Sequence, residues 1–186
     1  MAAIRGSTIG IFKRRMIRAA KLDADLYEEV EADKGALSQA VWVVILASIA
    51  TGIGSFARGG AAGIAAGIVS SLFGWLVWAY LTYLIGTKMF PEPQTESNIG
   101  ELLRTIGFSS SPGLLRIFGI IPGLTGPVFF ITSLWMLAAM VVGVRQALDY
   151  TSTLRAVGVC LIGWVIQVLL FGLLLFLFGG PPQQTI

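Results

Sequence analysis

The sequence contains no histidine, one cysteine and only ten acidic residues among 186. Without histidine, the chain lacks the commonest general base and the commonest neutral metal ligand. Cys160 lies in an apolar run and has no second cysteine with which to form an intrachain disulfide. No acidic residue falls inside a long apolar run, whereas proton-coupled transporters and intramembrane proteases usually need buried ionisable groups. The sequence therefore predicts no catalytic residue, no metal site and no cofactor.

Apolar residues dominate what remains. The chain is 55% hydrophobic and 12% charged, whereas a soluble domain carries about 25% charged residues. A soluble fold of this length does not bury so much apolar surface, so lipid is the expected solvent for most of the chain. We attribute the formal charge of +3 to Lys and Arg residues in the loops of a membrane protein, and not to a nucleic-acid interface.

Five apolar segments are long enough to cross a hydrocarbon layer of about 30 Å. They cover about 37–56, 64–85, 102–122, 128–144 and 157–178. The predicted fold class is all-α: a polytopic, five-helix transmembrane bundle with a broken third span and an amino-terminal amphipathic helix. Residues 1–36 are assigned to that helix on the cytoplasmic side, 37–180 to the transmembrane domain and 181–186 to a short tail.

The third segment is interrupted by Ser109, Ser110, Ser111, Pro112 and Gly113. Proline removes a backbone donor, and serine hydroxyls can bond the freed groups. We interpret the break as a kink or re-entrant turn. The alternative is a discontinuous transporter helix that exposes its ends to substrate.

Arg116 follows the break and is a charge that can lie at membrane depth. It either contacts an anion or lipid headgroup, or extends to the outer interface. Gln167, the lone amide of the last segment, is expected to form an interhelical hydrogen bond.

Residues 7–33 are predicted to form one amphipathic helix outside the membrane. Its basic residues precede its acidic ones, an order that opposes the helix macrodipole. Anionic headgroups of the inner leaflet would compensate the basic end. The predicted membrane-surface residues are Lys13, Arg14, Arg15, Arg18 and Lys21. The alternative is a solvated helix whose charges only keep it soluble.

The basic residues also predict an orientation. If the five segments alternate from a cytoplasmic amino terminus, all 13 Lys and Arg residues except Arg58 and Arg116 lie on the inner side. This follows the positive-inside rule and places the carboxy terminus outside.

Small residues predict a helix-packing face in the second segment. Gly59, Gly63 and Gly67 stand four apart, and Gly74 continues the stripe. Such stripes allow close approach of helix backbones. The partner is expected to be another helix of this chain, with another membrane protein or a second copy as the alternative.

Three stretches resemble the Yip-domain (Ypt/Rab-interacting protein) family, which comprises small five-span membrane proteins with a cytoplasmic amino terminus. They are 107–112 at the break, 135–148, and 153–156 before the last segment. Eukaryotic members bind Rab-type GTPases and serve vesicle traffic. Here Asp25, Leu26 and Tyr27 are followed by Glu28 and Glu29 instead of the eukaryotic Gly-Pro. The resemblance thus implies a bacterial-type member in the bacterial cell membrane.

The predicted function is that of a non-enzymatic membrane scaffold or accessory subunit. It would act through helix–helix contacts with other membrane proteins or with itself, and through contacts with the anionic inner leaflet. The alternative is a small transporter or channel-like protein that uses the broken third span.

Overall fold

The computed structural model describes residues 8–178, with side chains except those of 56–59, 61–63, 66, 171 and 174–178. The described residues form helices and no strands, which confirms the predicted all-α class. In chain order the elements are α1 (Thr8–Ala20), α2 (Ala24–Ala32), α3 (Ala36–Gly54), α4 (Phe56–Leu84), the π-helical turn η1 (Ile85–Met89), α5 (Ile99–Ser109), the 3₁₀ helix η2 (Ser111–Ile120), α6 (Thr125–Ala147) and α7 (Thr153–Phe178).

Within the described residues, four helical stretches are long and apolar enough to cross a membrane. They are Ala36–Gly54, Gly67–Met89, Thr125–Ala147 and Thr153–Leu170. The shortest has 18 residues and extends about 27 Å, close to the thickness of a bilayer core. These stretches correspond to four of the five predicted segments. The remaining one, 102–122, is divided between α5 and η2 and forms no single helix of this length.

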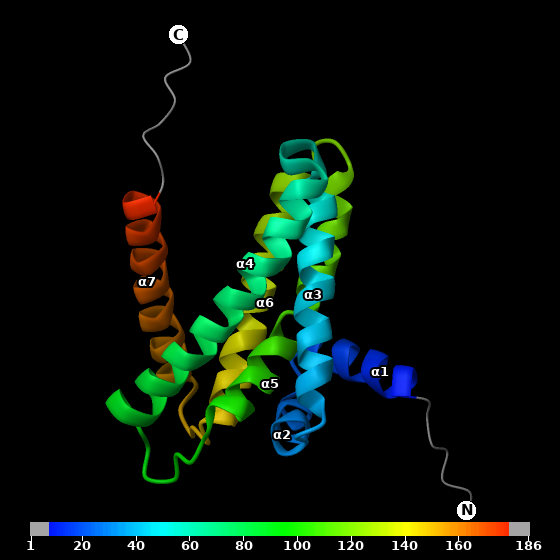
Figure 1. The fold of residues 1–186 in the computed structure, drawn as a ribbon. Helices are drawn as coiled ribbons and strands as arrows, with labels where there is room; N and C mark the ends of the chain where they lie inside the picture. The colour runs from blue at the N-terminus through cyan, green and yellow to red at the C-terminus, as the bar shows by residue number, and fades with distance from the viewer. Residues whose placement is uncertain (1–7, 179–186) are drawn as a thin grey trace, which may run out of the picture.

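The long helices pack unequally (Figure 1). α3, α4 and α6 gather with η2 into a central bundle, whereas α7 contacts it near one end and diverges toward the other. α4 is bent at Gly60, whose φ of 56° lies in the left-handed region that glycine adopts readily. The divergence of α7 leaves apolar side chains such as Leu161 and Trp164 more than half exposed.

α5 and η2 run beside α3 and in the same direction. At the start of this contact, a Cβ added to Gly107 would lie 2.7 Å from the Cβ of Ala40. Near its end, a Cβ added to Gly119 would lie 3.1 Å from the carbonyl oxygen of Gly54, the last residue of α3. Together the two short helices therefore follow α3 to its carboxyl end.

The prediction of one continuous helix over 7–33 is wrong. The described part of this segment forms α1 and α2, separated by a turn at Leu22, whose φ is 62°. Asp23 caps the second helix by accepting a hydrogen bond from the Leu26 amide at 3.4 Å. Because the chain turns there, α2 folds back against α1 instead of extending it.

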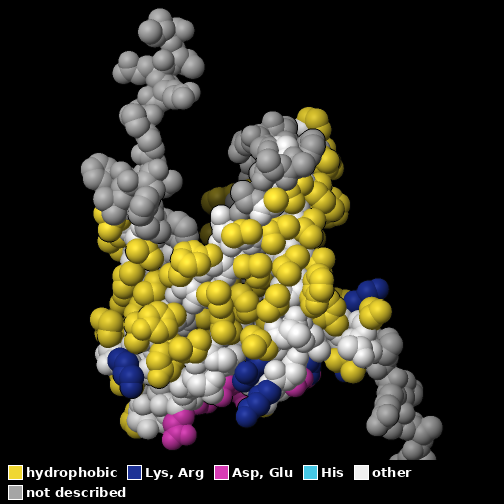
Figure 2. Space-filling model, viewed as in Figure 1, with side chains coloured by type: hydrophobic (Ala, Val, Ile, Leu, Met, Phe, Trp, Pro, Cys, Tyr) yellow, Lys and Arg dark blue, Asp and Glu magenta, His cyan; other side chains and the backbone are white. Residues whose placement is uncertain are grey.

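Polar and apolar surfaces are separated along the bundle (Figure 2). Charged side chains gather at the end where α2 and the loop after η1 lie, and apolar side chains cover the visible face above them. On this face the apolar side chains lie over the long helices, as expected for surfaces that face lipid.

Candidate functional site

The first candidate site is the platform, which we define as α1 and α2. Leu26, Tyr27 and Val30 of α2 have no exposed surface. A Cβ added to Gly143 of α6 would come within 3.1 Å of the Tyr27 ring, and the Tyr27 hydroxyl donates to the Ala19 carbonyl at 3.3 Å. Burial raises the pKa of Tyr27 to about 12. The second helix of the platform is therefore part of the protein core.

Arg15 connects both platform helices to α3. Its side chain is 9% exposed, with Nε 2.8 Å from Glu29 Oε1 and Nη2 2.8 Å from Asp33 Oδ2. Nη1 donates to Gln39 Oε1 at 3.1 Å. The hydrogen bond from Arg15 is the largest influence on Asp33 and holds its pKa below the ordinary value. Three acceptors thus compensate the burial of this guanidinium.

Arg18 makes a second set of ion pairs within the platform. Its Nε lies 2.6 Å from Asp23 Oδ2, and its Nη1 lies 2.5 Å from Glu29 Oε2. The bond from Arg18 is the main cause of the lowered pKa of Asp23. Burial alone would raise the pKa of Glu29, but the bonds from Arg15 and Arg18 outweigh it and lower that pKa. Carboxylates of the folded-back segment thereby neutralise part of the basic cluster.

The five predicted membrane-surface residues consequently divide into two groups. Arg15 and Arg18 face carboxylates of this chain, whereas Lys13, Arg14 and Lys21 are exposed. The sequence carried a signal for this division, because six acidic residues follow the basic ones at a distance suited to a helical hairpin. The missing information was the turn at Leu22, a residue that rarely adopts positive φ.

Arg104 of α5 fixes the end of α2, although no sequence pattern singled it out. Its side chain is buried, and its Nε donates to the Val30 carbonyl at 2.9 Å. Nη2 donates to the carbonyl of Glu31. These carbonyls lie in the last turn of α2, where no intrahelical donor remains. A capping box between Asn98 and Glu101 starts α5 and thereby positions Arg104.

Glu31 should make stability depend on pH between about 5 and 8. Burial, followed by the charges of Glu101, Asp149 and Glu28, raises its pKa from 4.5 to about 7. A raised carboxyl pKa means that the folded state retains a proton that the unfolded state loses above about pH 4.5. Stability should therefore fall as pH rises toward 7 and remain lower above it. Thermal unfolding in detergent at pH 5, 6, 7 and 8 measures this effect.

Glu31→Gln provides the control, because a neutral amide carries no titration. We expect the variant to be more stable than the parent at pH 8 by about 1 kcal/mol, a value reduced from the full shift for solvent screening. At pH 5 the two proteins should unfold at similar temperatures. A parent whose stability rises from pH 5 to pH 8 would contradict the assignment.

The second candidate site adjoins the predicted helix break. Pro112 has no amide hydrogen for the carbonyl of Phe108, four residues earlier, and the Ser111 hydroxyl donates to that carbonyl at 2.7 Å. The Ser109 hydroxyl donates to the carbonyls of Thr105 and Ala139 at 3.0 and 3.1 Å. Serine hydroxyls thus bond backbone groups around the proline, in the manner expected from the sequence.

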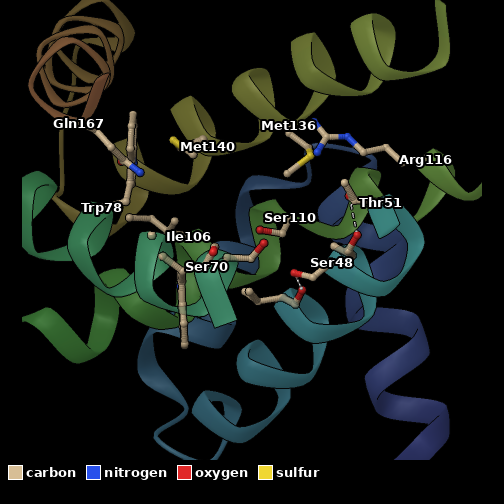
Figure 3. A pocket seen from close by; sticks show the side chains of 15 residues that line it. Ser48, Thr51, Ser70, Trp78, Ile106, Ser110, Arg116, Met136, Met140 and Gln167 are labelled. Carbon is tan, nitrogen blue, oxygen red and sulfur yellow. Dashed lines mark hydrogen bonds between the residues drawn. The ribbon is translucent and has the colours of Figure 1, made fainter. Parts of the chain in front are cut away.

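Ser110, between these two serines, faces a cavity of about 370 Å³ that we call the bundle cavity (Figure 3). The lining comes from α3, α4, α5, η2, α6 and α7, and none of its residues in the described part of the chain is a carboxylate. Trp78 Nε1 and Gln167 Oε1 line it, and both are buried without a hydrogen-bond partner in the described chain. The interhelical bond expected from Gln167 is therefore not formed by this oxygen. The remaining hydroxyl-bearing and charged side chains of the lining are Ser48, Thr51, Ser70, Ser71 and Arg116.

The predicted packing glycines have different surroundings. A Cβ added to Gly67 would meet nothing within 4 Å, and one added to Gly74 would lie 3.5 Å from Gln167 Nε2 of α7. The surroundings of Gly59 and Gly63 lie outside the part of the chain described at side-chain level. Gly74 therefore faces a helix of this chain, while Gly67 faces open space.

The apolar helices, the charged end and the cavity define a multi-pass α-helical membrane protein. Within this class, the chain belongs to the Yip1 domain family, whose model matches residues 24–177. This match confirms the resemblance and contains all three stretches that carried it. It does not assign the chain to a bacterial branch. No curated protein and no solved structure matches the chain.

The family match begins at Ala24, which is also the first residue of α2. α2 and the bundle helices up to residue 177 therefore belong to the matched domain. α1 precedes the matched residues.

Proposed function

We propose that this protein is a non-enzymatic membrane scaffold or accessory subunit that presents α1 at the cytoplasmic membrane surface. The supporting observation is the arrangement of α1, which projects sideways from the bundle while α2 is held in the core (Figure 1). A rigidly anchored, exposed helix at the membrane surface is a suitable contact for lipid headgroups and for a membrane partner.

The exposed row of α1 alternates apolar and basic side chains. Ile9, Lys13, Ile17 and Lys21 recur at intervals of four and therefore share one face; all four are exposed. Isoleucine can enter the acyl boundary while lysine reaches the headgroups. The Trp135 indole donates to the Ala20 carbonyl at 2.6 Å, which ties the carboxyl end of α1 to α6. This geometry favours an interfacial helix over a solvated one.

The same proposal includes five crossings and a cytoplasmic amino terminus. α5 and η2 follow α3 along its length, so the pair can act as a third crossing although neither helix is long enough alone. An odd number of crossings places the platform and the carboxyl end of α7 on opposite sides. The positive-inside rule then assigns the charged end to the cytoplasm and to an anionic leaflet.

A non-enzymatic role is supported by how the polar groups are used. Carboxylates of the platform pair with Arg15 and Arg18, and the serines of the break bond backbone carbonyls. No cluster of His, Cys, Asp and Glu suited to a metal occurs among the described residues. Among the described residues of the two candidate sites, no nucleophile is paired with the base that covalent catalysis needs.

Spin labels on α1 test the membrane contact. With Cys160→Ala as background, a label at Ile17 should collide more with dissolved oxygen than with a water-soluble nickel reagent. A label at the exposed Asp25 of α2 should show the opposite preference. Equal nickel accessibility at both positions would show that α1 is solvated.

A variant without the exposed basic residues of this segment tests whether their charges maintain the membrane contact. In anionic nanodiscs, Lys13→Gln, Arg14→Gln and Lys21→Gln together should shift the equilibrium of α1 from the membrane-bound to the solvated state by about a hundredfold, since each exposed basic residue contributes about 1 kcal/mol. Recovery of partners in mild detergent should also fall. Deletion of 7–33 is unsuitable for this purpose, because α2 is part of the core.

The second candidate function is that of a small transporter or channel-like protein. The observation that favours it is the bundle cavity beside the break, onto which Ser110 faces. In the Cys160→Ala background, Ser110→Cys should then react with aqueous thiol reagents in a sealed membrane. Complete protection would indicate a dry kink.

A further inference from the structure

Arg116 carries a charge that no described carboxylate neutralises. Its Nε donates to Thr132 Oγ1 at 3.2 Å, and its Nη2 donates to Ser133 Oγ at 2.8 Å. The guanidinium carbon lies 5.2 Å from the centre of the Phe129 ring. These neutral neighbours hold the guanidinium in place without compensating its charge. Among the described residues, the guanidinium therefore has no countercharge within ion-pair distance.

Two cavities of different character meet at Arg116. One is the bundle cavity, where hydroxyl groups lie near the guanidinium (Figure 3). The other has a volume of about 460 Å³ and lies between α6 and α7; we call it the α6–α7 groove. Its walls include Leu137, Leu161 and Trp164, and no described residue of the lining is a carboxylate. Because Leu161 and Trp164 are more than half exposed, the groove is open to the surrounding lipid.

Along α6, the polar part of the site lies nearer the membrane surface and the apolar part lies nearer the middle of the membrane. A lipid molecule has its headgroup and acyl chain in the same order. Thr132, which accepts a hydrogen bond from Arg116, lies seven residues after the start of α6. This places it about 10 Å along the helix from the end of α6 that is opposite the platform. Leu137 and Met140 lie further along α6, toward the middle of the membrane. A headgroup at Arg116 therefore has its acyl chain directed into the α6–α7 groove.

We propose that an anionic phospholipid of the leaflet opposite the platform binds here, with its phosphate at Arg116 and an acyl chain in the α6–α7 groove. Charge complementarity selects the headgroup, since the described lining residues offer a cation and hydroxyl groups but no acid. The unpartnered Trp78 Nε1 adds a free hydrogen-bond donor to the bundle cavity, whereas the unpartnered Gln167 Oε1 is an acceptor that only a hydroxyl or another donor can bind. The site is separate from the platform and does not rest on its proposed role.

Titration of the full-length protein with lipid in mild detergent tests this site. The background carries Lys13→Gln, Arg14→Gln and Lys21→Gln, so that contacts of the platform do not contribute. Phosphatidylglycerol should raise the unfolding temperature, whereas phosphatidylcholine and inorganic phosphate should have little effect. Arg116→Gln should weaken the apparent affinity for phosphatidylglycerol at least tenfold, as expected for the loss of a charged hydrogen bond. Lys88→Gln, which removes an exposed cation elsewhere, should change nothing.

Leu161→Trp provides a variant that keeps Arg116 and fills the groove. It should also reduce the response to phosphatidylglycerol, which keeps the test decisive if Arg116→Gln fails to fold. An unchanged phosphatidylglycerol response in either folded variant would overturn the proposal. Stabilisation by inorganic phosphate equal to that by phosphatidylglycerol would also overturn it, because the ligand would then be a free anion.

Discussion

Replacement of Gly54 by alanine should destabilise the bundle by about 3 kcal/mol, at the upper end of the cost of overpacking. A Cβ at this position would overlap the carbonyl oxygen of Arg116 and lie 3.2 Å from the ring of Phe129. The overlapping atom belongs to the backbone, so no side-chain rotation relieves the contact. α3 and η2 would have to move apart at the carboxyl end of α3, where they pack against each other. Thermal unfolding in detergent measures the loss.

Gly67→Ala is the matched control, because a Cβ there meets nothing within 4 Å. Alanine in an open helix position should stabilise by up to about 1 kcal/mol relative to glycine. If Gly67 instead contacts a second copy of the chain, this variant should lose self-association while the monomer remains folded. Equal unfolding temperatures for Gly54→Ala and the parent would contradict the close packing of α3 against η2.

The four long helices and the end that carries the charges follow directly from the sequence. Apolar runs of 18 or more residues have few alternatives to spanning a membrane, because a bilayer requires every backbone group to be bonded within the helix. The hydrogen bond from a serine hydroxyl to the carbonyl that Pro112 leaves without a donor was also predictable, since the missing amide and the nearby serines are local features of the sequence.

The contacts that position the candidate sites depend on residues distant in sequence. Arg104 binds carbonyls of α2 that precede it by more than 70 residues. The raised pKa of Glu31 comes from its burial and from acids on other elements, including Glu101 and Asp149. The bundle cavity draws its lining from helices throughout the chain. None of these relations leaves a periodic pattern in a single sequence.

Arg104→Met should release the platform from the bundle and destabilise the protein by about 3 kcal/mol. The variant keeps an unbranched apolar side chain but leaves the carbonyls of Val30 and Glu31 without their donors. Unsatisfied buried acceptors cost about 1–3 kcal/mol each. Hydrogen–deuterium exchange should accelerate in α2 and much less in α3 and α6. Arg14→Met, at an exposed position of α1, should leave exchange in α2 unchanged.

Titration of Glu31 separates a specific role of Arg104 from simple loss of packing. The charge of Arg104 lowers the pKa of Glu31, acting against burial and the neighbouring acids that raise it. Removing this charge should move the Glu31 transition above pH 7, provided that α2 stays in place. Arg104→Lys retains the charge but has no planar guanidinium to bond both carbonyls. It should therefore lower stability, but shift the pH of the Glu31 transition less than Arg104→Met does. A transition at the same pH in all three proteins would mean that Arg104 acts on α2 through packing alone.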